Sequence, residues 1–281
     1  MLTQEQTRQY LQRIDYHDSL TQESATLSDL QWAHLTHIPY ENLNILAGIP
    51  LSLKPQDLFD KIVVDRRGGY CFELQGLFKE LLEALGFSVV QYAARFLDEG
   101  TTIQMRRHRV LVVTLGGWRY LVDVGVRNEA PRKALHLICD EVQSDGICQY
   151  RFDRDRFFGW VLLQKEMGKD WKPMYGFTEE VQIDDDFVMP SFYCEKHTDS
   201  GFNKYMKISI FSGASNFTIV DGVFKEYRSG KVQLRKRLTG PEELGGILKQ
   251  YFGLEIFPIY RRDERSGTNA IQNEDTPAFT G

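Results

Sequence analysis

The chain has 281 residues and a net charge of −5, with 42% hydrophobic and 26% charged residues. This composition is ordinary for a globular protein, and the length allows one large domain or two to three small ones. The charge argues against a nucleic-acid partner, and no apolar run approaches the roughly 20 residues of a membrane helix, so no membrane partner is expected. The oligomeric state stays open.

The first ninety or so residues are predicted to be mainly helical. Thr3 and Gln6 have the spacing of a capping box at a helix start. A second helix is expected to begin at Ser28, as its N-cap, and to end before Pro39. The clearest helix is predicted within residues 72–87, where leucines recur at three- and four-residue steps until Gly86 stops the helix.

From about Val89 the pattern changes to strands. Two β-rich runs surround Gly116 and Gly117, which is a strong hairpin signal. A further strand-like segment occupies residues 150–165. Residues 205–238 contain four short runs that predict a meander of strands.

The end of the chain is predicted to contain one more helix and a polar tail. Pro241 stands where the first turn of this helix would lie. The tail from Arg261 is polar and weakly patterned, so no element is predicted in it.

The cysteines are scattered and form no C-x-x-C pair, so neither a zinc site nor a disulfide framework is indicated and no metal is expected. We therefore expect a reducing, cytoplasmic location. The four are Cys71, Cys139, Cys148 and Cys194.

Cys71 stands at the head of the clearest helix, directly after a charged turn with two glycines. Unpaired N–H groups and the helix dipole stabilise a thiolate at such a position, and the same groups could receive an oxyanion. Gly68 and Gly69 would allow a tight turn and leave room for an approaching carbonyl. Most cysteines are inert core residues, so a nucleophilic role for Cys71 requires a base nearby.

The predicted hairpin offers that base. If Gly116 and Gly117 form a two-residue turn, counting back along both strands places His108 opposite Gly125, with Asp123 as its diagonal neighbour. His108 and Asp123 then share one face, within reach of a hydrogen bond. A carboxylate so placed fixes the imidazole tautomer and supports the imidazolium that pairs with a thiolate.

The alternatives for these residues are structural. Residues 106–109, the densest basic stretch, are predicted to form a solvated loop, with contact to a phosphorylated small molecule as the second possibility. In that case His108 is a surface residue and Asp123 an ordinary strand-end carboxylate. A bulge in the hairpin would also place them on opposite faces.

Four motifs together resemble the arylamine N-acetyltransferases, from the amino terminus to about residue 257. The combination of R-G-G-x-C with E-N-L and V-D-V-G is specific, whereas Cys and His alone would not be. The motifs are PYENL at 39–43, RRGGYCFE at 66–73, the histidine His108 before a hydrophobic strand, and LVDVG at 121–125.

The resemblance implies an α+β fold with a papain/transglutaminase-like catalytic core. An N-terminal helical bundle that carries the nucleophile would occupy residues 1–90. A central β-barrel-like domain with the His and Asp would occupy 91–190, and a C-terminal α/β lid with the polar tail 191–281.

The resemblance also implies a catalytic triad of Cys71, His108 and Asp123 and a ping-pong reaction. Acetyl-coenzyme A would be the acyl-donor substrate and would acetylate Cys71. An aromatic amine, hydrazine or N-hydroxyarylamine would then take the acetyl group.

Five further residues stand at family positions around the site, three that match the family and two that depart from it. The resemblance implies that Glu41 and Arg67 pair as a support shell. Phe202 matches an aromatic position near the acyl-carrier pocket. Val126 and Arg127 stand where the family usually has Phe-Gly, so we expect them to contact substrate or coenzyme A, and Arg127 could either meet a coenzyme A phosphate or obstruct its entry.

Two other classes of function remain compatible with these motifs. A Cys-His-Asp amide synthase or cysteine hydrolase would use the same triad, and only the shape of the pocket would distinguish it. A non-catalytic protein that binds coenzyme A or an amine would fit the altered segment after LVDVG.

Overall fold

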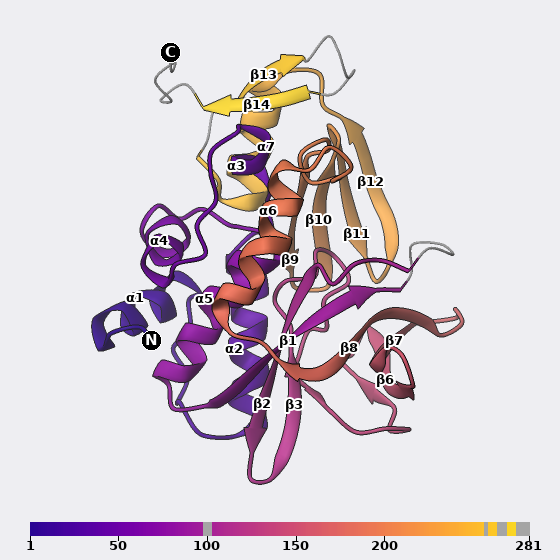
Figure 1. Ribbon diagram of the computed structural model, residues 1–281. Helices are drawn as coiled ribbons and strands as arrows, with labels where there is room; N and C mark the ends of the chain where they lie inside the picture. The colour runs from indigo at the N-terminus through magenta and orange to yellow at the C-terminus, as the bar shows by residue number, and fades with distance from the viewer. Residues whose placement is uncertain (98–102, 256–257, 263–268, 274–281) are drawn as a thin grey trace.

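Helices cover one side of an eight-stranded sheet, and a four-stranded sheet lies above that sheet in the view of Figure 1. The structure is a computed structural model that describes residues 1–97, 103–255, 258–262 and 269–273. The helices are α1 (Gln4–Arg13), α2 (Ser24–His37), α3 (Leu43–Leu46), α4 (Pro55–Phe59), the π-helix η1 (Asp60–Val64), α5 (Cys71–Ala84), the 3-10 helix η2 (Asp184–Phe187), α6 (Val188–Lys196) and α7 (Pro241–Phe252). An α+β architecture was expected and is confirmed.

The N-terminal helices begin and end largely as their capping signals predict. In α1 the Thr3 hydroxyl accepts from the Gln6 N–H and the Gln6 side chain accepts from the Thr3 N–H, which completes the predicted capping box. The start predicted for α2 is wrong, because the helix begins at Ser24. The Ser28 hydroxyl lies inside the helix and donates to the Ser24 carbonyl (2.8 Å).

Helix α5 is the central helix of the N-terminal part, and most of its side chains are buried. It ends before Gly86, whose φ of +86° favours glycine. One of its two buried acidic groups, Glu73, accepts from the Lys61 ammonium (2.7 Å). A helix so enclosed holds its first residue, Cys71, in a fixed position.

The eight-stranded sheet has the order β4-β3-β2-β1-β8-β7-β6-β5 and curls into a nearly closed barrel. Its edges approach each other, since the Gln143 side chain accepts from the backbone N–H of His136 and donates to its carbonyl, both at 2.7 Å. The strands are β1 (Ser88–Phe96), β2 (His108–Leu115), β3 (Trp118–Val122), β4 (Leu135–His136), β5 (Gln143–Ser144), β6 (Cys148–Asp155), β7 (Gly159–Glu166) and β8 (Lys172–Val181).

The hairpin between β2 and β3 has the predicted register. Gly116 and Gly117 have φ values of +56° and +84°, as a two-residue hairpin turn requires, and Leu115 pairs with Trp118. This register was the premise for placing a histidine and a carboxylate side by side.

The predicted meander forms an antiparallel four-stranded sheet in the order β12-β11-β10-β9. Helix α7 starts with Pro241, as expected, and shares a second hydrophobic core with this sheet. The strands are β9 (Lys207–Ser212), β10 (Ser215–Val220), β11 (Val223–Arg228) and β12 (Lys231–Arg237).

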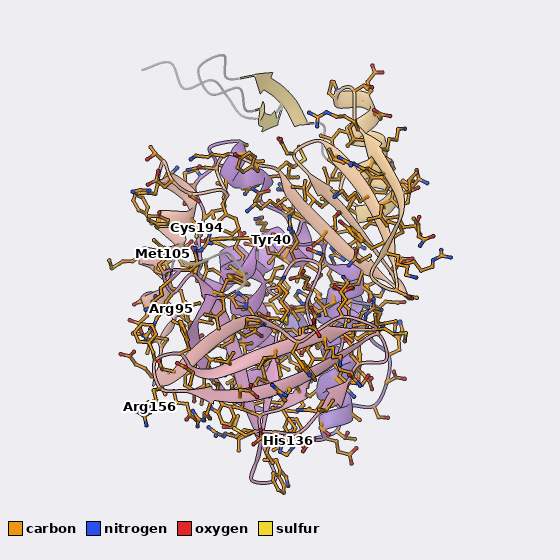
Figure 2. All side chains as sticks on the ribbon, turned by 90° about the vertical axis from the view of Figure 1, so that its right-hand side faces the viewer. Tyr40, Arg95, Met105, His136, Arg156 and Cys194 are labelled. Carbon is orange, nitrogen blue, oxygen red and sulfur yellow. The ribbon has the colours of Figure 1, made fainter. Side chains whose placement is uncertain are left out.

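One residue joins this sheet to the segment that precedes Cys71. Tyr40 exchanges two backbone hydrogen bonds with Ser209 of β9, at 2.8 and 2.9 Å. The same residue forms a parallel bridge with Gly69. Figure 2 shows Tyr40 between the helices and the four-stranded sheet.

The sequence missed two features of the C-terminal half. Helix α6 has Pro190 in its first turn, where proline is tolerated, and no helix was predicted there. The tail was expected to lack regular elements, which is wrong for β13 (Pro258–Arg262) and β14 (Asn269–Asn273), since these strands pair. The rest of the tail, 263–268 and 274–281, lies outside the described residues. Among the described residues, no helix is both long and apolar enough to cross a membrane.

A buried histidine in α2 couples folding to pH. His34 is fully buried, with its Nδ1 2.8 Å from the Tyr10 hydroxyl. Burial, followed by the charges of Arg13 and His37, lowers the pKa of His34 to about 3. The unfolded chain therefore binds a proton at His34 near pH 6.5 that the folded chain does not bind.

We expect this histidine to destabilise the protein in acid. The free energy of unfolding should be highest above pH 6.5 and fall as the pH decreases, by about 3 kcal/mol at pH 4 from this group. In His34→Gln this part of the pH dependence should disappear, whereas His37→Gln, on the exposed face of the same helix, should keep it. Urea unfolding at several pH values measures the difference, and identical pH profiles for the two variants would contradict the assignment.

Candidate active site

Cys71 is the first residue of α5 and is only 2% exposed. Its thiol donates to the carbonyl of Arg107 (3.7 Å). Burial raises the pKa of this thiol well above its usual range, Cys194 and Asp123 raise it further, and the Phe72 N–H and Arg107 oppose the rise. The helix start was expected to favour the thiolate, but desolvation outweighs it. A thiolate at Cys71 therefore needs a cation formed beside it.

His108 and Asp123 supply the pair that the hairpin predicted. His108 Nε2 lies 2.8 Å from Asp123 Oδ2, and both side chains are buried. An ionised carboxylate only accepts, so the ring proton belongs on Nε2. The other nitrogen, Nδ1, is buried and has no hydrogen-bond partner among the described residues. It is left to accept a proton.

The imidazole is held by packing as well as by Asp123. The Phe96 and Tyr175 rings lie against it, with centroid distances of 5.0 and 5.1 Å. Tyr175 comes from β8, so the barrel brings a strand far along the chain to the histidine.

Four donors fix the Asp123 carboxylate. Oδ2 accepts from His108 and from the Tyr175 hydroxyl (2.7 Å). Oδ1 accepts from the Gln75 amide (2.9 Å) and the Gly125 N–H (2.8 Å). Gln75 lies one helical turn after the cysteine, which ties the nucleophile's helix to the carboxylate.

Gly125 brings the 123–125 segment against the nucleophile. A Cβ on Gly125 would lie 3.1 Å from both Cα and Cβ of Cys71, so a side chain there would force the two segments apart. Asp123 accepts hydrogen bonds from the Gly125 N–H and from His108, and Gly125 lies against Cys71. The structure therefore brings Cys71, His108 and Asp123 into one site. Their catalytic roles stay a prediction.

A cavity of about 130 Å³ opens beside Cys71. The predicted contact residues Val126, Arg127 and Phe202 all line it. The rest of its lining includes Tyr40, Phe96, Arg107, Glu129, Met174 and Lys207.

A larger cavity, of about 440 Å³, lies among β1, β6, β7 and β8. It shares Phe96 with the first cavity but contains none of the residues Cys71, His108 and Asp123. The smaller cavity is therefore the candidate active site.

Glu41 and Arg67 meet beneath the segment that leads to Cys71. Glu41 Oε1 accepts from Arg67 Nη2 (2.8 Å) and Nε (3.1 Å), and Oε2 accepts from the Leu43 N–H (2.7 Å). Burial alone would raise the pKa of Glu41, but the charges of Arg67 and Lys61 outweigh it and hold that pKa below its usual value. The two residues are paired as the resemblance implies, and their supporting role is a prediction.

Gly68 serves packing rather than access to the thiol. A Cβ on Gly68 would lie 1.9 Å from the Pro39 carbonyl oxygen. Only glycine allows the 66–69 segment to lie against residues 39–41, where the Glu41 N–H donates to Gly69 (2.8 Å).

The basic run 106–109 is not the predicted solvated loop. Arg109 is 1% exposed, pairs with Asp184 (2.5 Å), and lies 4.7 Å from the centre of the Phe187 ring. Arg107 lines the cavity beside Cys71. Strand β2 begins at His108, so Arg109 belongs to the strand, and its side chain is buried.

Several residues of the site have no local sequence signal. Tyr175 and Met174 belong to β8, and their approach depends on the pairing of β8 with β1. Lys207 reaches the cavity from β9. Gln31 of α2 accepts from the Asp123 N–H (3.1 Å). Such contacts join distant segments and leave no pattern in the residues around them.

All four cysteines are free. Within residues 1–97 and 103–255, whose side chains the structure describes, no group of three or more His, Cys, Asp and Glu could hold a metal ion.

Comparison with known proteins identifies the class as an acyltransferase. A family model described as N-acetyltransferase matches residues 24–258. The arylamine N-acetyltransferase of Mycobacterium tuberculosis is 32% identical over 259 residues, which cover 90% of each chain. The chain belongs to the arylamine N-acetyltransferase family.

Solved structures agree with the predicted fold. The arylamine N-acetyltransferase from Salmonella typhimurium has a TM-score of 0.85 at 28% identity, over 91% of this chain and 93% of that one. The Mycobacterium marinum enzyme, solved in complex with CoA, has a TM-score of 0.82 at 30% identity, over 89% and 93%. These structural matches confirm the predicted fold class, a helical bundle, a barrel-like domain and a lid around a papain-like core.

Proposed function

We propose that the protein transfers an acetyl group from acetyl-coenzyme A to aromatic amines, hydrazines or N-hydroxyarylamines through an acetyl-Cys71 intermediate. The observation that carries the proposal is His108, whose Nε2 is held by Asp123 and whose buried Nδ1 has no hydrogen-bond partner among the described residues. Its neighbour in the chain, Arg107, accepts a hydrogen bond from the buried Cys71 thiol through its carbonyl. Membership of the family and the CoA complex of a relative support it.

In the first half-reaction the Cys71 proton moves to His108 Nδ1, and the thiolate attacks the acetyl carbonyl. The imidazolium compensates the thiolate inside a buried site, where an isolated thiolate would be costly. The C–S bond to coenzyme A breaks, and its thiolate takes the proton back from His108.

In the second half-reaction the amine attacks the acetyl-thioester while His108 accepts its proton. The new C–N or C–O bond forms, the C–S bond to Cys71 breaks, and the Cys71 sulfur recovers the proton. The thiol is buried and the cavity beside it is small, which leaves little room for water and favours the amine over hydrolysis. A nucleophilic thiol must stay reduced, which suits the cytoplasmic location proposed from the scattered cysteines.

An intact-mass experiment tests this reaction directly. Acetyl-coenzyme A should produce a single acetyl adduct that disappears when an arylamine is added. Cys71→Ser should form no adduct, and Cys139→Ser, a matched control on another free thiol, should form it normally. No adduct on the folded protein would overturn the proposal. An adduct that persists with amines but clears in water would instead indicate a hydrolase.

His108→Gln separates a base from a structural histidine. We expect adduct formation to slow by about 10²- to 10⁴-fold or more, because the variant lacks the nitrogen that takes the thiol proton. Cooperative thermal unfolding should be retained. Unfolding of the variant, or rapid acetylation, would contradict the assigned role.

A further inference from the structure

Cys194 is a buried thiol that the proposed reaction does not use. It lies in α6, it is fully buried, and its sulfur is free. Its carbonyl accepts from the Ser200 hydroxyl (2.6 Å), and the Ser200 oxygen in turn accepts from the Phe202 N–H (3.2 Å). Phe202 lines the cavity beside Cys71. Two hydrogen bonds therefore tie the second thiol to the wall of the candidate active site.

One face of α6 packs against the start of α5, where the nucleophile stands (Figure 1). The residues on either side of the nucleophile make the contacts. The Tyr70 hydroxyl oxygen lies 2.5 Å from that of Ser191, and the Phe72 ring lies 5.8 Å from the Phe187 ring. Phe187, Ser191 and Cys194 are spaced by four and three residues, so they share one face of the helix. The face of α6 that meets the start of α5 therefore includes Cys194.

The two thiols also share their charged neighbours. After burial, Cys194 is the group that raises the pKa of the Cys71 thiol most, ahead of Asp123. Burial raises the pKa of Cys194 to about 11, although Arg107 and Lys207 oppose that rise. Both of these cations line the cavity beside Cys71, and the Arg107 carbonyl accepts from the Cys71 thiol. The packing and the electrostatics thus agree that the two sulfurs are neighbours.

We propose that Cys194 is a resolving thiol, which forms an internal disulfide with Cys71 when a hydroperoxide oxidises the nucleophile. The Cys71 thiolate attacks an oxygen of the hydroperoxide and the O–O bond breaks, so that Cys71 becomes a sulfenic acid. The leaving hydroxide or alkoxide takes the proton held by His108. The Cys194 sulfur then attacks the Cys71 sulfur, the S–S bond forms and the S–O bond breaks. The hydroxyl leaves as water with the Cys194 proton, so one hydroperoxide oxidises two thiols.

The disulfide would protect the nucleophile from irreversible damage. A sulfenic acid without a thiol beside it is oxidised further to sulfinic and sulfonic acids, which small thiols do not reduce. A disulfide is returned to two thiols by thiol–disulfide exchange. The inference goes beyond the proposed function, because it requires a Cys71 thiolate but no acyl transfer.

Peptide mapping of the folded wild type after treatment with hydrogen peroxide, without acetyl-coenzyme A, tests the proposal. The remaining thiols are alkylated in denaturant before digestion. We expect the four free thiols to fall to two, because one bond takes up a pair, and we expect a peptide that links Cys71 to Cys194. Dithiothreitol should restore all four. The proposal is wrong if Cys71 stays reduced, if it is oxidised without this link, or if it pairs with Cys139 or Cys148.

Cys194→Ser isolates the second step. In this variant dimedone should trap Cys71 as a sulfenic acid, and longer exposure should produce sulfinic acid. Dithiothreitol should then recover about tenfold less reduced Cys71 than in the wild type. Cys139→Ser, a matched control on another free thiol, should form the disulfide normally. Equal recovery in the wild type and in Cys194→Ser would contradict the resolving role. Thermal unfolding verifies that each variant is folded, and Cys194→Ala replaces the serine variant if the buried hydroxyl disturbs folding.

The outcomes also separate this inference from the proposed function, because alkylation and dimedone report on the sulfurs directly. If the disulfide forms but acetyl-coenzyme A does not acetylate Cys71, only the proposed function fails. If Cys71 is acetylated but peroxide never links it to Cys194, only the resolving role is wrong.

Discussion

Asp123→Asn is expected to slow acetylation of Cys71 by about 10³- to 10⁴-fold while the protein stays folded. Gln75 and the Gly125 N–H both donate to Oδ1, and Gln75 is also fixed by its bond to the Arg109 carbonyl (3.0 Å). The oxygen of the new amide must therefore face these donors, and its NH₂ must face His108. The NH₂ then donates to Nε2, which moves the ring proton to Nδ1, where the thiol proton should be received.

Single-turnover acetylation, followed by intact mass or by release of free coenzyme A thiol, measures this effect. Tyr175→Phe is the matched comparison, because it removes one of the four donors without changing the tautomer. It should slow the reaction by about tenfold or less. A rate for Asp123→Asn similar to that of Tyr175→Phe would show that the carboxylate does not orient the histidine.

Arg67→Met is expected to lower the free energy of unfolding by about 3–5 kcal/mol at neutral pH. The variant removes Arg67, the ion-pair partner of the fully buried Glu41 carboxylate, and leaves only the charge of Lys61 to oppose its desolvation. Its pKa, now below the usual value, should rise, because burial then dominates. In the wild type the lowered pKa of Glu41 contributes to the free energy of unfolding, and this contribution is lost in acid. In the variant the raised pKa of Glu41 has the opposite effect, because protonation in acid then stabilises the folded state. The loss should therefore shrink as the pH falls from about 7 to about 4.

Chemical denaturation over this pH range tests the prediction. Combining Arg67→Met with Glu41→Gln should recover part of the lost stability, since no buried charge remains. The exposed pair Arg8 and Glu5 in α1 provides a control, and Arg8→Met should change stability little. A similar small loss for Arg67→Met, independent of pH, would show that the buried pair contributes nothing beyond a surface pair.

The parts of the fold and site that could be predicted depend on local signals. A two-residue glycine turn fixes the register of a hairpin, and counting from this turn along both strands correctly predicts that His108 lies beside Asp123. Leucine periodicity and a terminal glycine identified α5, and Cys71 stands at its start as predicted. The start predicted for α2 was wrong because the helix begins at Ser24, where the N-cap residue Glu23 makes no side-chain capping bond that could mark the start.

The remaining parts depend on contacts between distant segments. The approach of Tyr175 to Asp123 requires β8 to pair with β1, and no turn between them specifies that pairing. The burial of Arg109 depends on Asp184, which lies in a different part of the chain. Charge alone predicted solvent exposure for this arginine, since composition does not reveal an ion-pair partner that is distant in the sequence.

The contact of Tyr40 with both Ser209 and Gly69 has a consequence for the fate of the acetyl group. Phe202 and Lys207 line the cavity from the C-terminal part, and Lys207 lies in β9, the strand that Tyr40 joins to the segment before Cys71. Under the proposed mechanism, opening of this contact would let water reach the thioester at Cys71. We therefore expect the partition between transfer and hydrolysis to depend on the backbone contacts of Tyr40 as well as on the triad.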